Sequence, residues 1–125
     1  MHTAIIIDDS KTSRSVLRTI LEKNGYEIVA EAANGEEGFE KYCDLHPDFV
    51  TLDITMPVMD GIQTLVKIKE YDPGAKVIMV TAAGQKGKMV DAIKLGAAEF
   101  VTKPFETDQI ISIIAVSYTH LRAHE

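Results

Sequence analysis

The sequence predicts one α/β domain in which five parallel strands form a sheet with helices on both faces. Three observations lead to this prediction. The length, 125 residues, is common for a single domain. Five short apolar segments alternate with five segments whose apolar residues recur at helical spacing. The first short segment is apolar at every position, which is typical of a strand buried on both faces. Such alternation implies parallel strands joined by crossover helices.

The expected strands are short and contain many β-branched residues. The first one, Ala4 to Ile7, stops at a pair of acidic residues. The other strands are expected at 27–31, 49–52, 76–80 and 99–101. A turn at 72–74, Asp-Pro-Gly, separates the third expected helix from the fourth strand.

The expected helices follow the strands one by one. Their recurring apolar residues are Val16, Leu17, Ile20 and Leu21; Phe39 and Tyr42; Ile62, Leu65, Val66 and Ile68; Met89, Val90 and Ile93; Ile110, Ile111, Ile113 and Ile114. Asn24-Gly25 and Gly96 end two of these helices, and Pro47 follows the end of another. Asn34 begins the second helix, and the last begins near Thr107.

Composition excludes several classes of protein. A net charge of −6 argues against general binding to nucleic acid. The single cysteine, Cys43, cannot support a disulfide framework or a zinc site, and we expect it to be a small buried apolar residue. No stretch approaches the ~20 apolar residues of a membrane span, and the N-terminus lacks the pattern of a signal peptide. We therefore expect a cytoplasmic protein without membrane contact.

Polar residues gather where the expected strands end. Asp8 and Asp9 follow the first strand, and Asp53 and Thr81 end the third and fourth. Lys103 follows the fifth. The carboxyl ends of parallel strands share one edge of the sheet, which is where ligands bind in such folds. If these four strands are neighbours, the five side chains converge on one crevice.

Three carboxylates in one crevice require positive charge. At ~4 Å, each pair repels by on the order of 4 kcal/mol with an effective dielectric constant near 20. Lys103 supplies one charge, and Mg²⁺ suits a site of a few carboxylates beside a phosphate. Such a site matches phosphoryl transfer. Asp53 can act as the nucleophile, and Lys103 and Thr81 can hold the phosphoryl oxygens.

Four segments together carry a family resemblance. They are Ile-Ile-Asp-Asp-Ser (6–10), Asp-Ile-Thr-Met-Pro-Val-Met-Asp-Gly (53–61), Val-Thr-Ala-Ala (80–83) and Val-Thr-Lys-Pro-Phe (101–105). With them, residues 3–116 resemble the receiver domains of two-component response regulators, most of all the single-domain CheY-type chemotaxis regulators. The resemblance implies a flavodoxin-like (βα)5 fold with strand order 2-1-3-4-5.

The resemblance also implies roles for the residues of the crevice. Asp53 would accept a phosphoryl group from a phosphohistidine of a histidine kinase. Asp9 and Asp53 would bind Mg²⁺ directly and Asp8 through water, and the backbone carbonyl of Thr55 would complete the protein ligands. Lys103 would pair with Asp53 and then with its phosphate.

A switch is implied as well. Thr81 would move to hydrogen-bond the phosphate, and Phe100 stands where the family keeps a rotating aromatic residue, although plain core packing is the alternative for Phe100. The Lys103-Pro104 bond is expected to be cis. Phosphorylation would then change the binding of a protein target, in chemotaxis the flagellar motor switch. We expect a monomer.

The last residues depart from this pattern. Residues 117–125 lose the apolar spacing of the preceding helix, so we assign residues 1–116 to the receiver domain and 117–125 to an atypical, foreign or read-through tail. The chain would alternatively be a receiver cut from a longer regulator, or a phosphorelay intermediate. An aspartyl-phosphate hydrolase is disfavoured because Thr55 stands where an acid/base aspartate is needed. No G-x-G-x-x-G follows the first strand, which disfavours a dinucleotide site.

Overall fold

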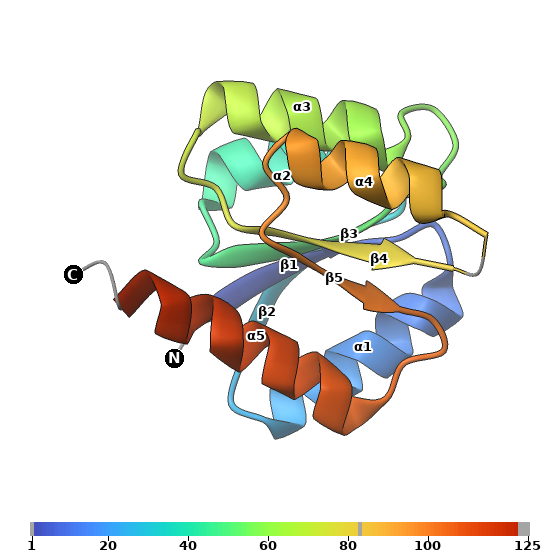
Figure 1. Cartoon of the computed structure of the whole chain (residues 1–125). Helices are drawn as coiled ribbons and strands as arrows, with labels where there is room; N and C mark the ends of the chain where they lie inside the picture. Colours follow the sequence, from blue (N-terminus) through green and yellow to red (C-terminus); the bar gives the residue numbers. More distant parts are fainter. Residues whose placement is uncertain (1, 83, 123–125) are drawn as a thin grey trace.

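Five parallel strands form one sheet in the order β2-β1-β3-β4-β5, as the computed structural model of residues 2–82 and 84–122 shows (Figure 1). The strands are β1 (Thr3–Ile7), β2 (Glu27–Ala32), β3 (Phe49–Asp53), β4 (Val77–Thr81) and β5 (Glu99–Thr102). Every neighbouring pair is parallel. The predicted fold class and strand order are confirmed, and strand boundaries differ from the expected ones by only a residue at some ends.

The helices lie on both faces of this sheet. They are α1 (Lys11–Lys23), α2 (Gly35–Leu45), α3 (Gly61–Tyr71), α4 (Lys86–Lys94) and α5 (Thr107–Arg122). In Figure 1, α2, α3 and α4 cover one face, and α1 and α5 cover the other. With right-handed crossovers, α1 lies on one face because its connection runs outward from β1 to β2, whereas α2, α3 and α4 lie on the other face because their connections run the opposite way, from β2 toward β5.

The core has two layers because successive strand residues point to opposite faces of the sheet. Ile5 and Ile7 pack into the cluster that contains Leu65 and Ile68 of α3. Ala4 and Ile6 pack into the other cluster, which contains Leu17 and Leu21 of α1 together with Ile110 and Ile114 of α5. Apart from the buried Thr51 of β3, the central strands are therefore apolar on both faces, and their other polar side chains lie at the strand ends.

Side-chain caps fix where three helices begin. Ser10 caps α1 by accepting a hydrogen bond from the Ser13 amide, and Asn34 caps α2 in the same way through Glu37. Asp60 caps α3 in a reciprocal box with Gln63. Because Ser10 provides the cap of α1, neither carboxylate of the preceding acidic pair is used for that purpose.

The last helix extends further than its apolar pattern. α5 continues to Arg122, so the change of sequence after residue 116 does not end the helical backbone. Residues 123–125 of the predicted tail lie outside the described residues, and the assignment of 117–125 to a separate segment stays a prediction. Within 2–82 and 84–122, no helix has the length and apolar character to span a membrane.

Candidate functional site

The strand order brings the predicted site residues to one edge of the sheet. Asp8 directly follows β1, and Asp53 is the last residue of β3, the neighbour of β1. Thr81 ends β4 and is in register with Thr102 of β5, one residue before Lys103. Since β1, β3, β4 and β5 are consecutive in the sheet, their carboxyl ends form one continuous rim.

Three carboxylates meet at this rim. Asp8, Asp9 and Asp53 each place a carboxylate oxygen within 4.8 Å of the others. Asp8 and Asp53 are buried, whereas Asp9 is exposed and opens the group to solvent. Nζ of Lys103 lies 3.1 Å from Oδ2 of Asp8 and 3.7 Å from Oδ2 of Asp53. The predicted convergence of these four side chains is thus seen in the structure.

The electrostatics of the rim are dominated by excess negative charge. Burial raises the pKa of Asp53 from 3.8 to about 6, and the charges of Asp8 and Asp9 act in the same direction. Lys103 and a backbone hydrogen bond from Ile54 oppose this rise without cancelling it. One ammonium group therefore does not balance the three carboxylates. Oxygen ligands of this charge and spacing fit a hard divalent cation.

The close approach of α3 fixes the backbone of Asp53. The amide of Gly61 donates a hydrogen bond to the carbonyl of Ile54 over 2.7 Å. A Cβ at Gly61 would lie 2.2 Å from the carbonyl oxygen of Asp53 and 2.7 Å from Cα of Ile54. Only glycine fits between the start of α3 and the end of β3, so Gly61 belongs to the scaffold of the site.

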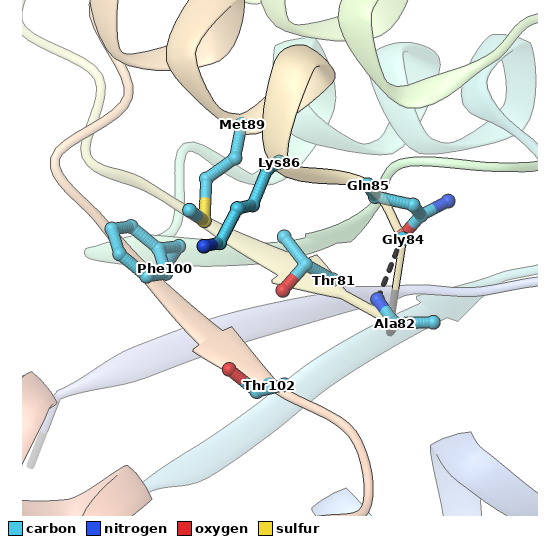
Figure 2. Close-up of a pocket in the computed structure, with 8 residues that line it drawn as sticks. All are labelled: Thr81, Ala82, Gly84, Gln85, Lys86, Met89, Phe100 and Thr102. Atoms are coloured by element: carbon cyan, nitrogen blue, oxygen red, sulfur yellow. Dashed lines mark hydrogen bonds between the residues drawn. The ribbon is translucent and has the colours of Figure 1, made fainter.

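Thr81 and Phe100 lie beside a cavity next to the rim. The Thr81 side chain is buried and donates a hydrogen bond to the carbonyl of Val101 over 3.4 Å. The cavity, of about 200 Å³, is shown in Figure 2 and is lined by Thr81, Ala82, Gly84, Gln85, Lys86, Met89, Phe100 and Thr102. Phe100 is half-buried and packs against the core cluster under α4. The two predicted switch residues therefore line the same space.

Two residues that support this region were not predicted from the sequence. Gln85 accepts a hydrogen bond from the amide of Ala82 over 2.7 Å (Figure 2) and donates one to Oγ1 of Thr55 over 2.6 Å. Nη1 of Arg14 donates a hydrogen bond to the backbone carbonyl of Asp8. The three-residue spacing of Ala82 and Gln85 is typical of a local side-chain-to-backbone bond, but no sequence signal points to the contacts that cross the fold.

Two further expectations concern local geometry and Cys43. The Lys103-Pro104 peptide bond is cis, as expected. Cys43 is half-buried on α2 rather than fully buried, and burial raises the pKa of its thiol. A raised pKa keeps the thiol protonated, which agrees with a packing role for this residue.

Known proteins match nearly the whole chain in sequence. Residues 4–115 match the family model described as the response regulator receiver domain. The chemotaxis protein CheY of Bacillus subtilis is 48% identical over 113 residues, which are 90% of this chain and 94% of that protein. CheY of Thermotoga maritima is 44% identical over 110 residues, 88% of this chain and 92% of that protein.

A solved structure is also similar to this chain, in both fold and sequence. A chain of the CheX-CheY-BeF3-Mg²⁺ complex of Borrelia burgdorferi superposes with a TM-score of 0.90 at 37% identity, over 94% of this chain and 89% of that chain. The family model, the relatives and this fold agree on one assignment. The chain belongs to the response regulator receiver domain family.

Proposed function

We propose that this chain is a phosphorylation-dependent signalling switch in which Asp53 accepts a phosphoryl group from a histidine kinase. The observation that carries the proposal is the group of three carboxylates at the strand ends, in contact with Lys103. Asp53 is the carboxylate that stands by itself at a strand end, between the neighbouring strands β1 and β4. Asp8 and Asp9 are adjacent and are suited to share a cation.

The transfer proceeds by exchange of one bond at phosphorus. A carboxylate oxygen of Asp53 forms a bond to phosphorus while the bond from phosphorus to the imidazole nitrogen of the donor breaks, and the imidazole keeps the electron pair. Lys103 neutralises negative charge on the phosphoryl oxygens, and the hydroxyl of Thr81 exchanges its bond to Val101 for one to the phosphate. Each group is at the rim before the donor arrives.

The carboxylate group fits Mg²⁺. Asp9, Asp53 and the backbone carbonyl of Thr55 would hold the ion directly and Asp8 through water. When bound, Mg²⁺ supplies positive charge that draws the phosphoryl oxygens and the carboxylates together. This charge would oppose the burial and the repulsion by Asp8 and Asp9 that together raise the pKa of Asp53.

The output is a change in protein binding. Thr81 and Phe100 line one cavity, so movement of the Thr81 hydroxyl toward the phosphate opens space into which the Phe100 ring rotates. A receiver domain acts through contacts with another protein, and the relatives named CheY support a chemotaxis target such as the flagellar motor switch. The Borrelia burgdorferi relative crystallised with CheX supports binding of a protein partner.

The remaining assignments complete the proposal. The protein acts as a cytoplasmic monomer without nucleic-acid or membrane contact, and it turns over no external substrate beyond its own aspartyl phosphate. Residues 1–116 form the receiver domain, supported by the family match to residues 4–115, and 117–125 form a separate segment.

The first experiment measures phosphorylation directly. The protein is incubated with Mg²⁺ and a small phosphodonor, and its intact mass is read beside Asp53→Asn and a sample without Mg²⁺. We expect a gain of one phosphoryl group in the complete reaction and in neither control. A gain that persists in Asp53→Asn rejects Asp53 as the acceptor, and no gain in a folded protein that binds Mg²⁺ rejects the switch. Phosphotransfer to a second histidine domain would instead indicate a phosphorelay.

A further inference from the structure

Arg14 contacts the acidic site through the backbone rather than through a carboxylate. Its Nη1 donates a hydrogen bond of 2.6 Å to the carbonyl oxygen of Asp8, and its Nε donates one of 3.1 Å to Oε1 of Glu31. The guanidinium group therefore spans from β2 to the loop after β1. The Arg14 side chain is only 16% exposed, so both bonds are made in a largely desolvated place.

The carbonyl of Asp8 belongs to the peptide plane that joins Asp8 to Asp9. The amide of Asp8 is already fixed by a 3.0 Å hydrogen bond to the carbonyl of Ala32, and its Oδ1 accepts one of 2.8 Å from the Ser10 amide. Because the peptide unit is planar, the bond from Arg14 also fixes where the Asp9 backbone begins. The position of that backbone determines where the exposed Asp9 carboxylate lies relative to Asp53.

Glu31 is a firm anchor for Arg14. Nη1 of Arg18 donates to Oε2 of Glu31 over 2.6 Å, and Nζ of Lys41 donates to its backbone carbonyl over 2.6 Å. The hydrogen bonds from Arg18 and Arg14 lower the pKa of the Glu31 carboxyl group, so this carboxylate stays charged at neutral pH. The contact that Arg14 makes between β2 and Asp8 therefore starts at Glu31, a residue that Arg18 and Lys41 also hold in place.

We propose that Arg14 is a positioning residue of the carboxylate site, which ties the Asp8 carbonyl to Glu31 and so holds Asp8 and Asp9 in the orientation that binds a divalent cation with Asp53. The inference rests on the proposed function, because it assigns Arg14 a part in the same cation site. It makes a prediction opposite to simple electrostatics. Removal of a nearby positive charge strengthens cation binding, whereas loss of a positioning contact weakens it.

The test compares Arg14→Met with Arg18→Met. Both variants lose one positive charge and one hydrogen bond to the Glu31 carboxylate, but only Arg14 contacts Asp8. Each folded protein is titrated with Mg²⁺ at constant ionic strength, and binding is followed through backbone amide NMR shifts. We expect Arg14→Met to weaken Mg²⁺ binding about tenfold, as loss of an outer supporting contact does. Arg18→Met should bind as wild type or slightly more tightly.

Three outcomes overturn the proposal: unchanged or tighter Mg²⁺ binding by Arg14→Met, equal weakening in both variants, or no saturable binding by the wild type. The last also rejects the proposed function, whereas the first two leave it standing. If Arg14→Met does not fold, Arg14→Lys and Arg18→Lys replace the pair. A single ammonium group keeps the charge but cannot span Asp8 and Glu31 as the guanidinium does. Weaker binding is then expected only in Arg14→Lys.

Discussion

Nε2 of Gln85 donates a hydrogen bond to Oγ1 of Thr55 over 2.6 Å, which joins the loop after β4 to the loop after β3. The same side chain accepts a hydrogen bond of 2.7 Å from the amide of Ala82. One amide group therefore ties together two of the loops that border Asp53. Movement of Thr81 toward a phosphate has to proceed with these bonds intact or break them.

Replacement of Gln85 is expected to loosen the loop after β4. Gln85→Ala removes the acceptor of the Ala82 amide, and loss of a hydrogen bond of about 1 kcal/mol corresponds to a roughly fivefold increase in local opening. Hydrogen exchange of the Ala82 amide, measured by NMR, should accelerate accordingly. Thr55→Val breaks only the bond between the loops and should accelerate this exchange less. Equal protection in Gln85→Ala and wild type would contradict the role of Gln85.

Lys103→Met tests whether the lysine stabilises the fold by offsetting the charge of the buried carboxylates. Without Mg²⁺, its loss leaves Asp8 and Asp53 buried without their cation, which should lower the free energy of unfolding by about 1–3 kcal/mol. Saturating Mg²⁺ replaces the missing charge and should remove most of this loss. Urea unfolding with and without Mg²⁺ measures both. Lys88→Met, at an exposed position of α4, is the control, and a loss independent of Mg²⁺ would refute the expectation.

Two glycines should respond oppositely to the same substitution. Gly61→Ala places a Cβ against the backbone of Asp53 and Ile54 and should destabilise the fold by about 3 kcal/mol. Gly87→Ala in α4 meets no atom within 4 Å and should stabilise the helix by about 0.5–1 kcal/mol. Thermal and urea unfolding of both variants test the pair. Similar effects at both positions would show that the contact at Gly61 is unimportant.

Glu31 should make the stability depend on pH. Its pKa is lowered in the folded protein, so its ion pairs stabilise the fold fully above its ordinary pKa of 4.5. This contribution is lost as the pH falls through the lowered value. Glu31→Gln should therefore cost about 1–2 kcal/mol at pH 7 and progressively less below pH 4. Urea unfolding across this pH range measures the effect of Glu31→Gln. The control is Glu22→Gln, which removes an exposed ion pair with Arg18. If the free energy of unfolding of Glu31→Gln differed from that of wild type by the same amount at every pH, the stabilising role of the charged Glu31 would be contradicted.

The sequence was sufficient to predict the sheet and the four charged residues of the rim. Apolar segments such as Ala4 to Ile7 identify buried strands, and residues that follow them at the carboxyl end must share one edge. The convergence of Asp8, Asp53 and Lys103 follows from this rule once the strand order is known. The order itself required the family resemblance, because alternation alone permits several arrangements of parallel strands.

Contacts that depend on side-chain geometry could not be predicted in this way. Arg14 and Gln85 look like ordinary surface positions in the sequence, and nothing there points to their bonds to Asp8 and Thr55. Val58 adopts a left-handed φ of 68°, which its β-branched side chain disfavours and which no local pattern announces. The extent of α5 was also hidden, since a helix can continue through residues without apolar periodicity when its backbone hydrogen bonds are kept.

Lys103, the side chain that supplies positive charge at the site, follows the last strand. This position has a consequence for synthesis on the ribosome. Asp8, Asp9 and Asp53 all leave the ribosome before Lys103 does. While the nascent chain lacks β5, docking of β3 against β1 brings the three carboxylates together without their lysine. During that interval Mg²⁺, which we propose these carboxylates bind, can supply the counter-charge. Its concentration therefore bears on how early the growing chain can assemble its central strands.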